Sequence, residues 1–207
     1  MDSVKKRLVF MWLFVFAVYL PFFIFMVLRH DVGTRPMSII GWSPGGIRYL
    51  ILYVLLTLPF CLYLVLFFNK HIATNDKFIN VMAVISCILT AIGAFIPIRR
   101  NVSEGVLFAH TVISVGGSVI LMLTILYALV MHALKQKYKA VILPLYGIYI
   151  AALLKAFYIL YTAALFQLST AVSFFIILLL NITVFYKPPC SYAPAKTCIY
   201  LDKSGVE

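Results

Sequence analysis

Apolar residues form six long runs along the chain, separated by short polar connections. The runs cover residues 8–28, 49–68, 79–98, 106–134, 140–166 and 168–186. Each reaches or approaches the roughly 20 residues that a helix needs to cross the hydrocarbon core of a bilayer. Because apolar residues are continuous within each run rather than alternating with polar ones, a membrane β-barrel is excluded. The pattern predicts an all-α fold, a six-transmembrane helical bundle over residues 1–186.

Two features interrupt this simple pattern. Pro21, Pro59 and Pro144 fall inside the runs, where we still expect helix because lipid offers the backbone no other hydrogen-bond partner. The longest connection, residues 29–48, contains several Gly, Pro and Ser residues, which favour turns. Its apolar part, residues 37–42, is expected to lie back on the membrane surface.

The composition agrees with a membrane protein and the charges predict its orientation. Only 11% of the 207 residues are charged and 64% are hydrophobic, so a soluble globule would lack polar surface. Eleven of the 17 lysines and arginines lie in the N-terminal segment, the second and fourth connections and the tail, against five in the other connections. The positive-inside rule therefore predicts N-in and C-in topology, with the cell membrane as the expected location. The tail, residues 187–207, is expected to be cytoplasmic and disordered.

The remaining positive residue, Lys155, lies within the fifth run, about fifteen residues from its start. Gly147, Ala151, Ala152 and Tyr158 lie near it at helical spacing, so this small and polar face is expected to point into the bundle. At about 1.5 Å per residue, Lys155 lies roughly 22 Å from the cytoplasmic end of the helix. Its ammonium group is therefore expected in the outer half of the bundle.

Polar stripes also follow the third and fourth runs. The fourth stripe begins at His110 and continues through Ser114, Gly117, Ser118 and Thr124, and the third carries Ser86, Thr90, Gly93 and Pro97. We expect the three stripes to converge in the outer half, close to the charged residues of the outer connections. The candidate ligand-binding residues are Lys155, His110, Arg100, Arg99, Tyr158, Asp31 and Glu104.

A packing role explains many of the same residues without a ligand. Small residues let helices approach closely in lipid, a lysine can snorkel to the interface, and a histidine can hydrogen-bond a neighbouring helix. Both interpretations stay open for Lys155. Since no acidic residue lies within a run, its counter-ion would be Asp31, Glu104 or an external anion such as a lipid phosphate.

We expect no cofactor, no metal and no nucleic-acid partner. His110 and His132 stand about 33 Å apart on one helix, so they cannot hold a haem between facing helices. A retinal on Lys155 would lack a carboxylate counter-ion within the membrane. Cys190 and Cys198 have no nearby histidine and make a poor zinc site. The positive charges are spread over both faces rather than along one groove, which argues against nucleic acid.

Two stretches, residues 37–68 and 88–123, resemble the six-helix membrane family called domain of unknown function 998, which is itself similar to DRAM-type membrane proteins. The shared elements are a Ser-x-x-Gly before the second helix, a Gly-x-Phe-x-Pro ending the third, and a His opening the fourth. The resemblance covers roughly two-thirds of the chain and implies architecture rather than a reaction. In place of the acidic residue that usually follows the Gly-x-Phe-x-Pro element in that family, this chain has Arg99 and Arg100. The matching positions are Ser38, Gly41, Gly93, Phe95, Pro97 and His110.

The leading functional hypothesis is a non-catalytic membrane protein that binds an anionic lipid headgroup or small anion in a basic outer-half pocket. Lys155, Arg100 and His110 would be the ligands. The alternatives are a membrane-embedded lipid-modifying enzyme with His110 as acid or base, a small transporter, and a structural membrane subunit. No known catalytic motif supports the enzyme. Membrane lipids are the expected partners, and a homo-oligomer is left open.

Overall fold

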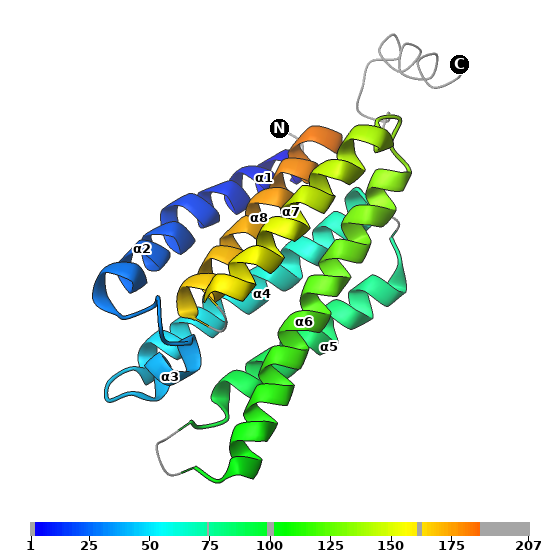
Figure 1. Cartoon of the computed structure of the whole chain (residues 1–207). Coiled ribbons are helices and arrows are strands. Elements are labelled where there is room, and N and C mark those ends of the chain that lie inside the picture. The colour runs from blue at the N-terminus through cyan, green and yellow to red at the C-terminus, as the bar shows by residue number, and fades with distance from the viewer. Residues whose placement is uncertain (1–2, 74, 99–101, 161–162, 187–207) are drawn as a thin grey trace.

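The structure, a computed structural model, describes residues 3–73, 75–98, 102–160 and 163–186, and this part of the chain is helical with no strand. The elements are α1 (Ser3–Phe14), the π-helical turn η1 (Val15–Tyr19), α2 (Leu20–Arg29), α3 (Met37–Trp42), α4 (Ile47–His71), α5 (Lys77–Phe95), α6 (Glu104–Leu134), α7 (Lys139–Leu160) and α8 (Ala164–Phe185). The long helices run side by side as one bundle (Figure 1). The all-α prediction is confirmed.

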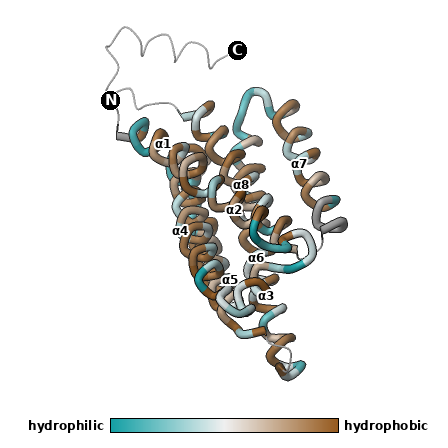
Figure 2. The backbone as a smooth tube through the Cα atoms, turned by 90° about the vertical axis from the view of Figure 1, so that its left-hand side faces the viewer, coloured by the Kyte–Doolittle hydropathy of each residue, from teal (hydrophilic) through white to brown (hydrophobic). Residues whose placement is uncertain are grey.

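Five of these helical segments are long and apolar enough to cross a membrane: Val4–Arg29, Ile47–His71, Lys77–Phe95, Glu104–Leu134 and Ala164–Phe185. The helix α7, 22 residues long, lies beside α6 and α8. Large apolar side chains cover the outside of the bundle, with Leu28 78% and Phe108 70% exposed. Hydrophobic residues follow the helices and hydrophilic residues gather at the connections (Figure 2). This is the architecture of a multi-pass membrane protein.

The three prolines are accommodated within helices, as expected. Helices α4 and α7 continue through Pro59 and Pro144. Before Pro21 the helix widens into η1. There the Leu20 amide donates to the carbonyl of Val15, five residues earlier, instead of to the carbonyl four residues earlier as in an α-helix. A proline ring clashes with the carbonyl four residues before it, and a π-helical turn provides the extra room.

The centre of the bundle is aromatic. Phe175 of α8 meets Tyr19 of η1 and Phe60 of α4 edge to face, with ring centroids 5.0 and 4.9 Å apart. The hydroxyl of Tyr19 shares a hydrogen bond of 3.1 Å with Thr57 of α4. Edge-to-face rings are a favourable arrangement, and the buried hydroxyls satisfy each other. These contacts hold η1, α4 and α8 together.

Small residues bring α5 and α6 together. A Cβ added at Gly93 would lie 2.5 Å from the Ser114 backbone, and one at Gly117 would lie 2.7 Å from the Thr90 amide nitrogen. Such distances mean that the two backbones touch where the glycines are. The polar stripes of the third and fourth runs therefore form a packing seam between α5 and α6, as small residues do between membrane helices.

The connection between α2 and α4 closes one end of the bundle. The amides of Ala164 and Leu165, at the start of α8, donate to the carbonyls of Arg35 and Val32, both at 2.8 Å. A helix start leaves such amides without partners inside the helix, so the connection satisfies them. As a result α8 begins at Ala164, and α7 ends at Leu160, earlier than the boundary between residues 166 and 168 that the sequence predicted.

Helix α3 packs on the bundle through four buried residues, among them Ile40 and Gly41. A Cβ added at Gly41 would lie 2.5 Å from the Cβ of Leu50 on α4, so the two helices are in close contact. The Met37 amide also donates to Oε1 of Gln167 on α8, at 3.2 Å. One side of residues 37–42 is thus buried against α4 and α8, and their position at the membrane surface stays a prediction.

Candidate functional site

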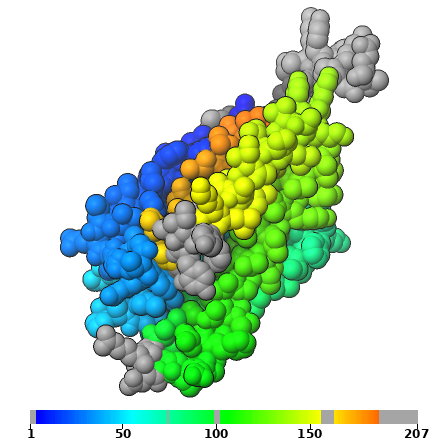
Figure 3. All heavy atoms as spheres, viewed as in Figure 1, coloured from blue at the N-terminus to red at the C-terminus, as the bar shows by residue number. Residues whose placement is uncertain are grey.

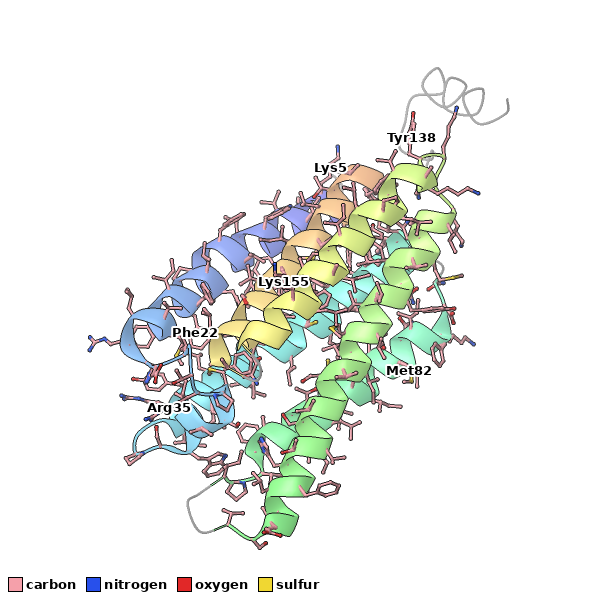
Figure 4. All side chains as sticks on the ribbon, in the orientation of Figure 1. Lys5, Phe22, Arg35, Met82, Tyr138 and Lys155 are labelled. Atoms are coloured by element: carbon pink, nitrogen blue, oxygen red, sulfur yellow. The ribbon has the colours of Figure 1, made fainter. Side chains whose placement is uncertain are left out.

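Lys155 does not point into the bundle. It is exposed, as are Gly147, Ala151 and Ala152 on the same side of α7, and nothing lies within 4 Å of a Cβ added at Gly147. Figure 4 shows Lys155 on the edge of α7 away from α6. The expected inward orientation of this face is therefore wrong, and so is the convergence of three stripes.

The face of α7 that turns inward carries aromatic side chains instead. Tyr146 is buried, and Tyr149, Ile150 and Leu153 are partly buried. The two tyrosine hydroxyls bond to α8, which is the physical reason for this orientation: turned outward, they would leave buried polar groups on α8 unpaired. The helical spacing of Tyr146, Tyr149 and Leu153 could have indicated the inward face of α7. Apolar residues occur on all sides of this helix, so the spacing does not stand out in the sequence.

His110 is buried in the wall of the α5–α6 pair, where its imidazole contacts the backbone at Gly93 and Ile96. The helix α5 ends at Phe95, just before Pro97, so its last carbonyls lack partners within the helix. The His110 side chain therefore supplies a polar contact to the backbone at the end of α5. Its Nδ1 is buried without a hydrogen bond to any described residue.

The other candidate residues do not join Lys155 or His110 in one site. Asp31 is exposed and accepts a hydrogen bond from the hydroxyl of Thr34, and Glu104 is exposed at the start of α6. No described carboxylate forms an ion pair with Lys155. Arg99 and Arg100 lie outside the described residues, and Tyr158 is described only as part of the α7 backbone.

A cavity of about 390 Å³ lies inside the bundle and extends from the end that the sequence predicts as outer, beside Met37 and Ser38, into the opposite half at Leu129 and Tyr146. Helices α4, α6, α7 and α8 supply most of its wall, two residues of α5 contribute, and α3 closes it through Met37 and Ser38. The volume lies in the range of about 300–1,000 Å³ that is typical of small-molecule pockets. Lys155, His110, Asp31 and Glu104, the four candidates whose side chains are described, are not among the lining residues.

The lining is apolar with a few hydroxyl and amide groups, and none of the described lining residues is charged. Several of the hydroxyls already have partners. Thr57 bonds to Tyr19, Thr90 donates to the carbonyl of Ser86 at 2.8 Å, and Ser118 donates to that of Ser114 at 2.9 Å. Such a wall suits an apolar molecule, because an ion would lose its hydration without gaining a counter-charge.

Two polar groups of α8 differ from these. The hydroxyl of Thr170 is buried and has no hydrogen-bond partner among the described residues. Gln167, one helical turn earlier, uses Oε1 to accept from the Met37 amide, and no described residue accepts from its Nε2. Both residues line the cavity. Neither residue was predicted from the sequence, because Gln167 falls between two expected runs, where polar residues are usual, and Thr170 lies close to it at the start of the last run.

Some of the lining residues of α6 and α7 are also exposed on the outside of the bundle. Val115, Val119 and Leu154 line the cavity and are 37%, 42% and 58% exposed. Figure 3 views the face on which α6 and α7 lie next to each other.

The described residues hold no group of three or more His, Cys, Asp or Glu side chains that could bind a metal ion. Cys61 and Cys87 are free thiols, and Cys61 lines the cavity. Comparison with family models, curated proteins and solved structures returns no match for this chain. The resemblance to domain of unknown function 998 therefore stays a prediction.

Proposed function

We propose that this protein is a six-span membrane protein, with both termini cytoplasmic, that takes the acyl chain of a membrane lipid into the cavity between α4, α6, α7 and α8. The observation that carries the proposal is a largely apolar cavity with no charged residue among its described lining, beside apolar side chains of α6 and α7 that are exposed on the outside of the bundle. A ligand dissolved in the bilayer enters such a cavity without crossing water.

Two observations support six spans. Helix α7 is 22 residues long, enough to cross the hydrocarbon core, and it lies against α8. The start of α1 and the end of α8 lie at the same end of the bundle (Figure 1), as an even number of crossings requires. The excess of lysine and arginine in the connections at that end favours a cytoplasmic location for it.

The observed lining favours an acyl chain over the anion of the leading sequence hypothesis. Lys155 and His110, its two described ligands, lie outside the cavity wall, and they occupy different places in the fold. No comparable observation supports a catalytic site or a path through the membrane. The acyl chain, in contrast, matches the chemistry of the wall.

Photo-crosslinking tests this proposal. The protein is reconstituted in phosphatidylcholine nanodiscs that contain a phosphatidylcholine with a diazirine in one acyl chain, and labelled peptides are mapped after illumination. We expect labels on lining residues of α6, α7 and α8. Ala171→Phe, which fills the cavity from α8, should lower this labelling several-fold. Ala152→Phe, on the exposed side of α7, should not.

Two further variants complete the test. Val119→Trp adds bulk to the α6 side of the wall, so it should also lower the labelling even if Ala171→Phe fails to fold. Lys155→Met should leave labelling of the cavity unchanged. Labels confined to outward-facing residues, or unchanged labelling of the lining in folded Ala171→Phe and Val119→Trp, would refute the proposal.

A further inference from the structure

The two ends of the bundle carry different kinds of positive residue. The connections opposite the start of α1 and the end of α8 (Figure 1) hold five arginines and no lysine, whereas the N-terminal segment, the other connections and the tail hold ten lysines and one arginine. The positive-inside rule counts both residue types alike, so it does not account for this difference. A guanidinium group offers a planar fork of donors that matches a phosphate with two parallel hydrogen bonds, and the ammonium group of lysine does not. The choice of arginine over lysine therefore favours a phosphate ligand at this end.

One aromatic contact brings two of these arginines together. Arg29 ends α2, and Arg48 lies in the first turn of α4. The residues that follow them, His30 and Tyr49, meet edge to face with their ring centroids 4.7 Å apart. The Arg48 guanidinium carbon lies 4.9 Å from the centre of the Tyr49 ring, and Nη2 donates to the Tyr49 hydroxyl at 3.0 Å. The two arginines therefore start from neighbouring points on the surface, and Tyr49 orients the Arg48 side chain.

The protein does not neutralise this pair of arginines. Both side chains are exposed, and no described carboxylate forms an ion pair with either of them. The nearest carboxylate along the chain, that of Asp31, accepts a hydrogen bond from the Thr34 hydroxyl. The whole connection over residues 29–48 holds three arginines and one aspartate. An anion that binds here is attracted by the excess positive charge and displaces no internal partner.

Apolar side chains beside the arginines indicate a lipid rather than a dissolved anion. Leu28 and Ile47, which directly precede the two arginines, are exposed. Phe25, one turn before Arg29, is also exposed, and its ring centroid lies 5.8 Å from that of Tyr49. At the helical rise, Phe25 lies about 6 Å closer to the middle of the bundle than Arg29 does. A phospholipid with its phosphate at the arginines would lay an acyl chain on this apolar surface, which a dissolved phosphate would leave uncovered.

We infer that the end of α2 and the start of α4 form a binding site for an anionic phospholipid, with its phosphate held by Arg29 and Arg48 and an acyl chain against Phe25 and Leu28. None of these residues lines the cavity, so the site is separate from the one proposed for an acyl chain, and neither depends on the other. A lipid with net negative charge is favoured over a zwitterionic one, because an amine in the headgroup would bring a second positive charge to a positive surface.

Competition for a photoactivatable lipid tests this inference. The full chain is reconstituted in phosphatidylcholine nanodiscs with a small fraction of a phosphatidylglycerol that carries a diazirine near its ester groups, and labelled peptides are mapped. We expect labels on residues 24–30 and 47–52. Unlabelled phosphatidylglycerol should remove them at a mole fraction about 5-fold lower than phosphatidylethanolamine does, since exposed charge contacts are individually weak. Inorganic phosphate should not remove them.

Arginine variants locate the site. The double variant Arg29→Gln with Arg48→Gln should lower the labelling about 3- to 10-fold, the combined effect of a few exposed charged contacts. Arg48→Lys keeps the charge and loses the fork of donors, so it should lower the labelling about 2-fold. The matched control is Arg35→Gln, an exposed arginine of the same connection whose carbonyl bonds to the start of α8. It should leave the labelling unchanged.

Each outcome decides the inference. Unchanged labelling in a double variant that keeps the wild-type melting temperature, or equal competition by phosphatidylethanolamine, overturns it. Competition by inorganic phosphate would mean a site for a free anion and overturns the choice of a lipid. If the double variant fails to fold, the two single variants decide, each with an expected loss of about 2-fold. Failure of acyl-chain labelling in the cavity, with this labelling intact, refutes the proposed function alone.

Discussion

The hydroxyl of Tyr146 on α7 donates a hydrogen bond to Oδ1 of Asn181 on α8, with 2.5 Å between the two oxygens. One turn further along α7, Tyr149 shares a hydrogen bond of 2.8 Å with Ser173. These two bonds link α7 to α8, and they set the rotation of α7. Because that rotation turns Ile150 and Leu153 toward the cavity, the two tyrosines also shape its wall.

Tyr146→Phe should lower the stability of the protein. Asn181 would keep its own bond to the Ile177 carbonyl through Nδ2 but leave Oδ1 buried without a donor. An unpaired buried acceptor costs about 1–3 kcal/mol. The variant should therefore melt several degrees below the wild type in detergent, followed by tryptophan fluorescence. Tyr138→Phe, at a tyrosine that is 67% exposed, is the control and should melt with the wild type. Identical melting of all three would contradict this role.

The small-residue stripes show what the sequence could and could not predict. The stripes on α6 and α7 look alike in the sequence, yet Gly117 meets the backbone of Thr90 whereas Gly147 meets nothing within 4 Å. A stripe predicts that close packing is possible, but whether a helix occupies the place beside it depends on the whole bundle. The hydrogen bonds of Tyr146 and Tyr149 set the rotation of α7 about its axis, so its small residues lie on the outside of the bundle.

Helix positions followed directly from the apolar runs, since lipid allows the backbone few alternatives. The connection at residues 135–138 was predicted to within a residue or two. The start of α8 was not, because its first amides bond to Val32 and Arg35, more than a hundred positions earlier in the chain. The candidate site failed for a related reason. The predicted site consisted mainly of charged residues, whereas the cavity is formed by uncharged residues that five helices and α3 bring together.

Gly117→Ala should destabilise the α5–α6 pair. The added Cβ would lie 2.7 Å from the Thr90 amide nitrogen, which is closer than real side chains pack, so the two helices must separate. Gly116→Ala is a matched control on the same turn, where nothing lies within 4 Å of the new Cβ. In an exposed helix position alanine is favoured over glycine by about 1 kcal/mol. In thermal unfolding, Gly117→Ala should melt lower than the wild type and Gly116→Ala equal or higher. A lower melting temperature for Gly116→Ala than for Gly117→Ala would contradict close packing of α5 and α6 at Gly117.

Asn69→Asp should loosen the connection between α4 and α5. Asn69 is fully buried, and its Nδ2 donates to the Asp76 carbonyl and to Oδ1 of Asn80, both at 2.8 Å, while its Oδ1 accepts from the Asp76 amide. A carboxylate keeps the acceptor and loses both donors, and it places a charge beside two oxygens. We expect faster trypsin cleavage at Lys70 and Lys77 in detergent. The matched control is Asn75→Gly, because Asn75 is exposed with a φ of 53°, which glycine adopts readily. Equal cleavage rates in both variants would contradict the role of Asn69.

The orientation and the number of spans can be read from three single-cysteine proteins labelled in intact cells with a membrane-impermeant maleimide. Ser103→Cys lies at the exposed start of α6, Lys137→Cys lies in the exposed turn between α6 and α7, and the third protein keeps the native Cys190 of the tail. With six spans and N-in topology, Ser103→Cys is labelled at once, and the other two only after permeabilisation. Labelling of Cys190 in intact cells, with Lys137→Cys still protected, would mean that α7 does not cross. Labelling of Lys137→Cys with Ser103→Cys protected would mean that the bundle is inverted, because α6 separates those two positions by the width of the membrane.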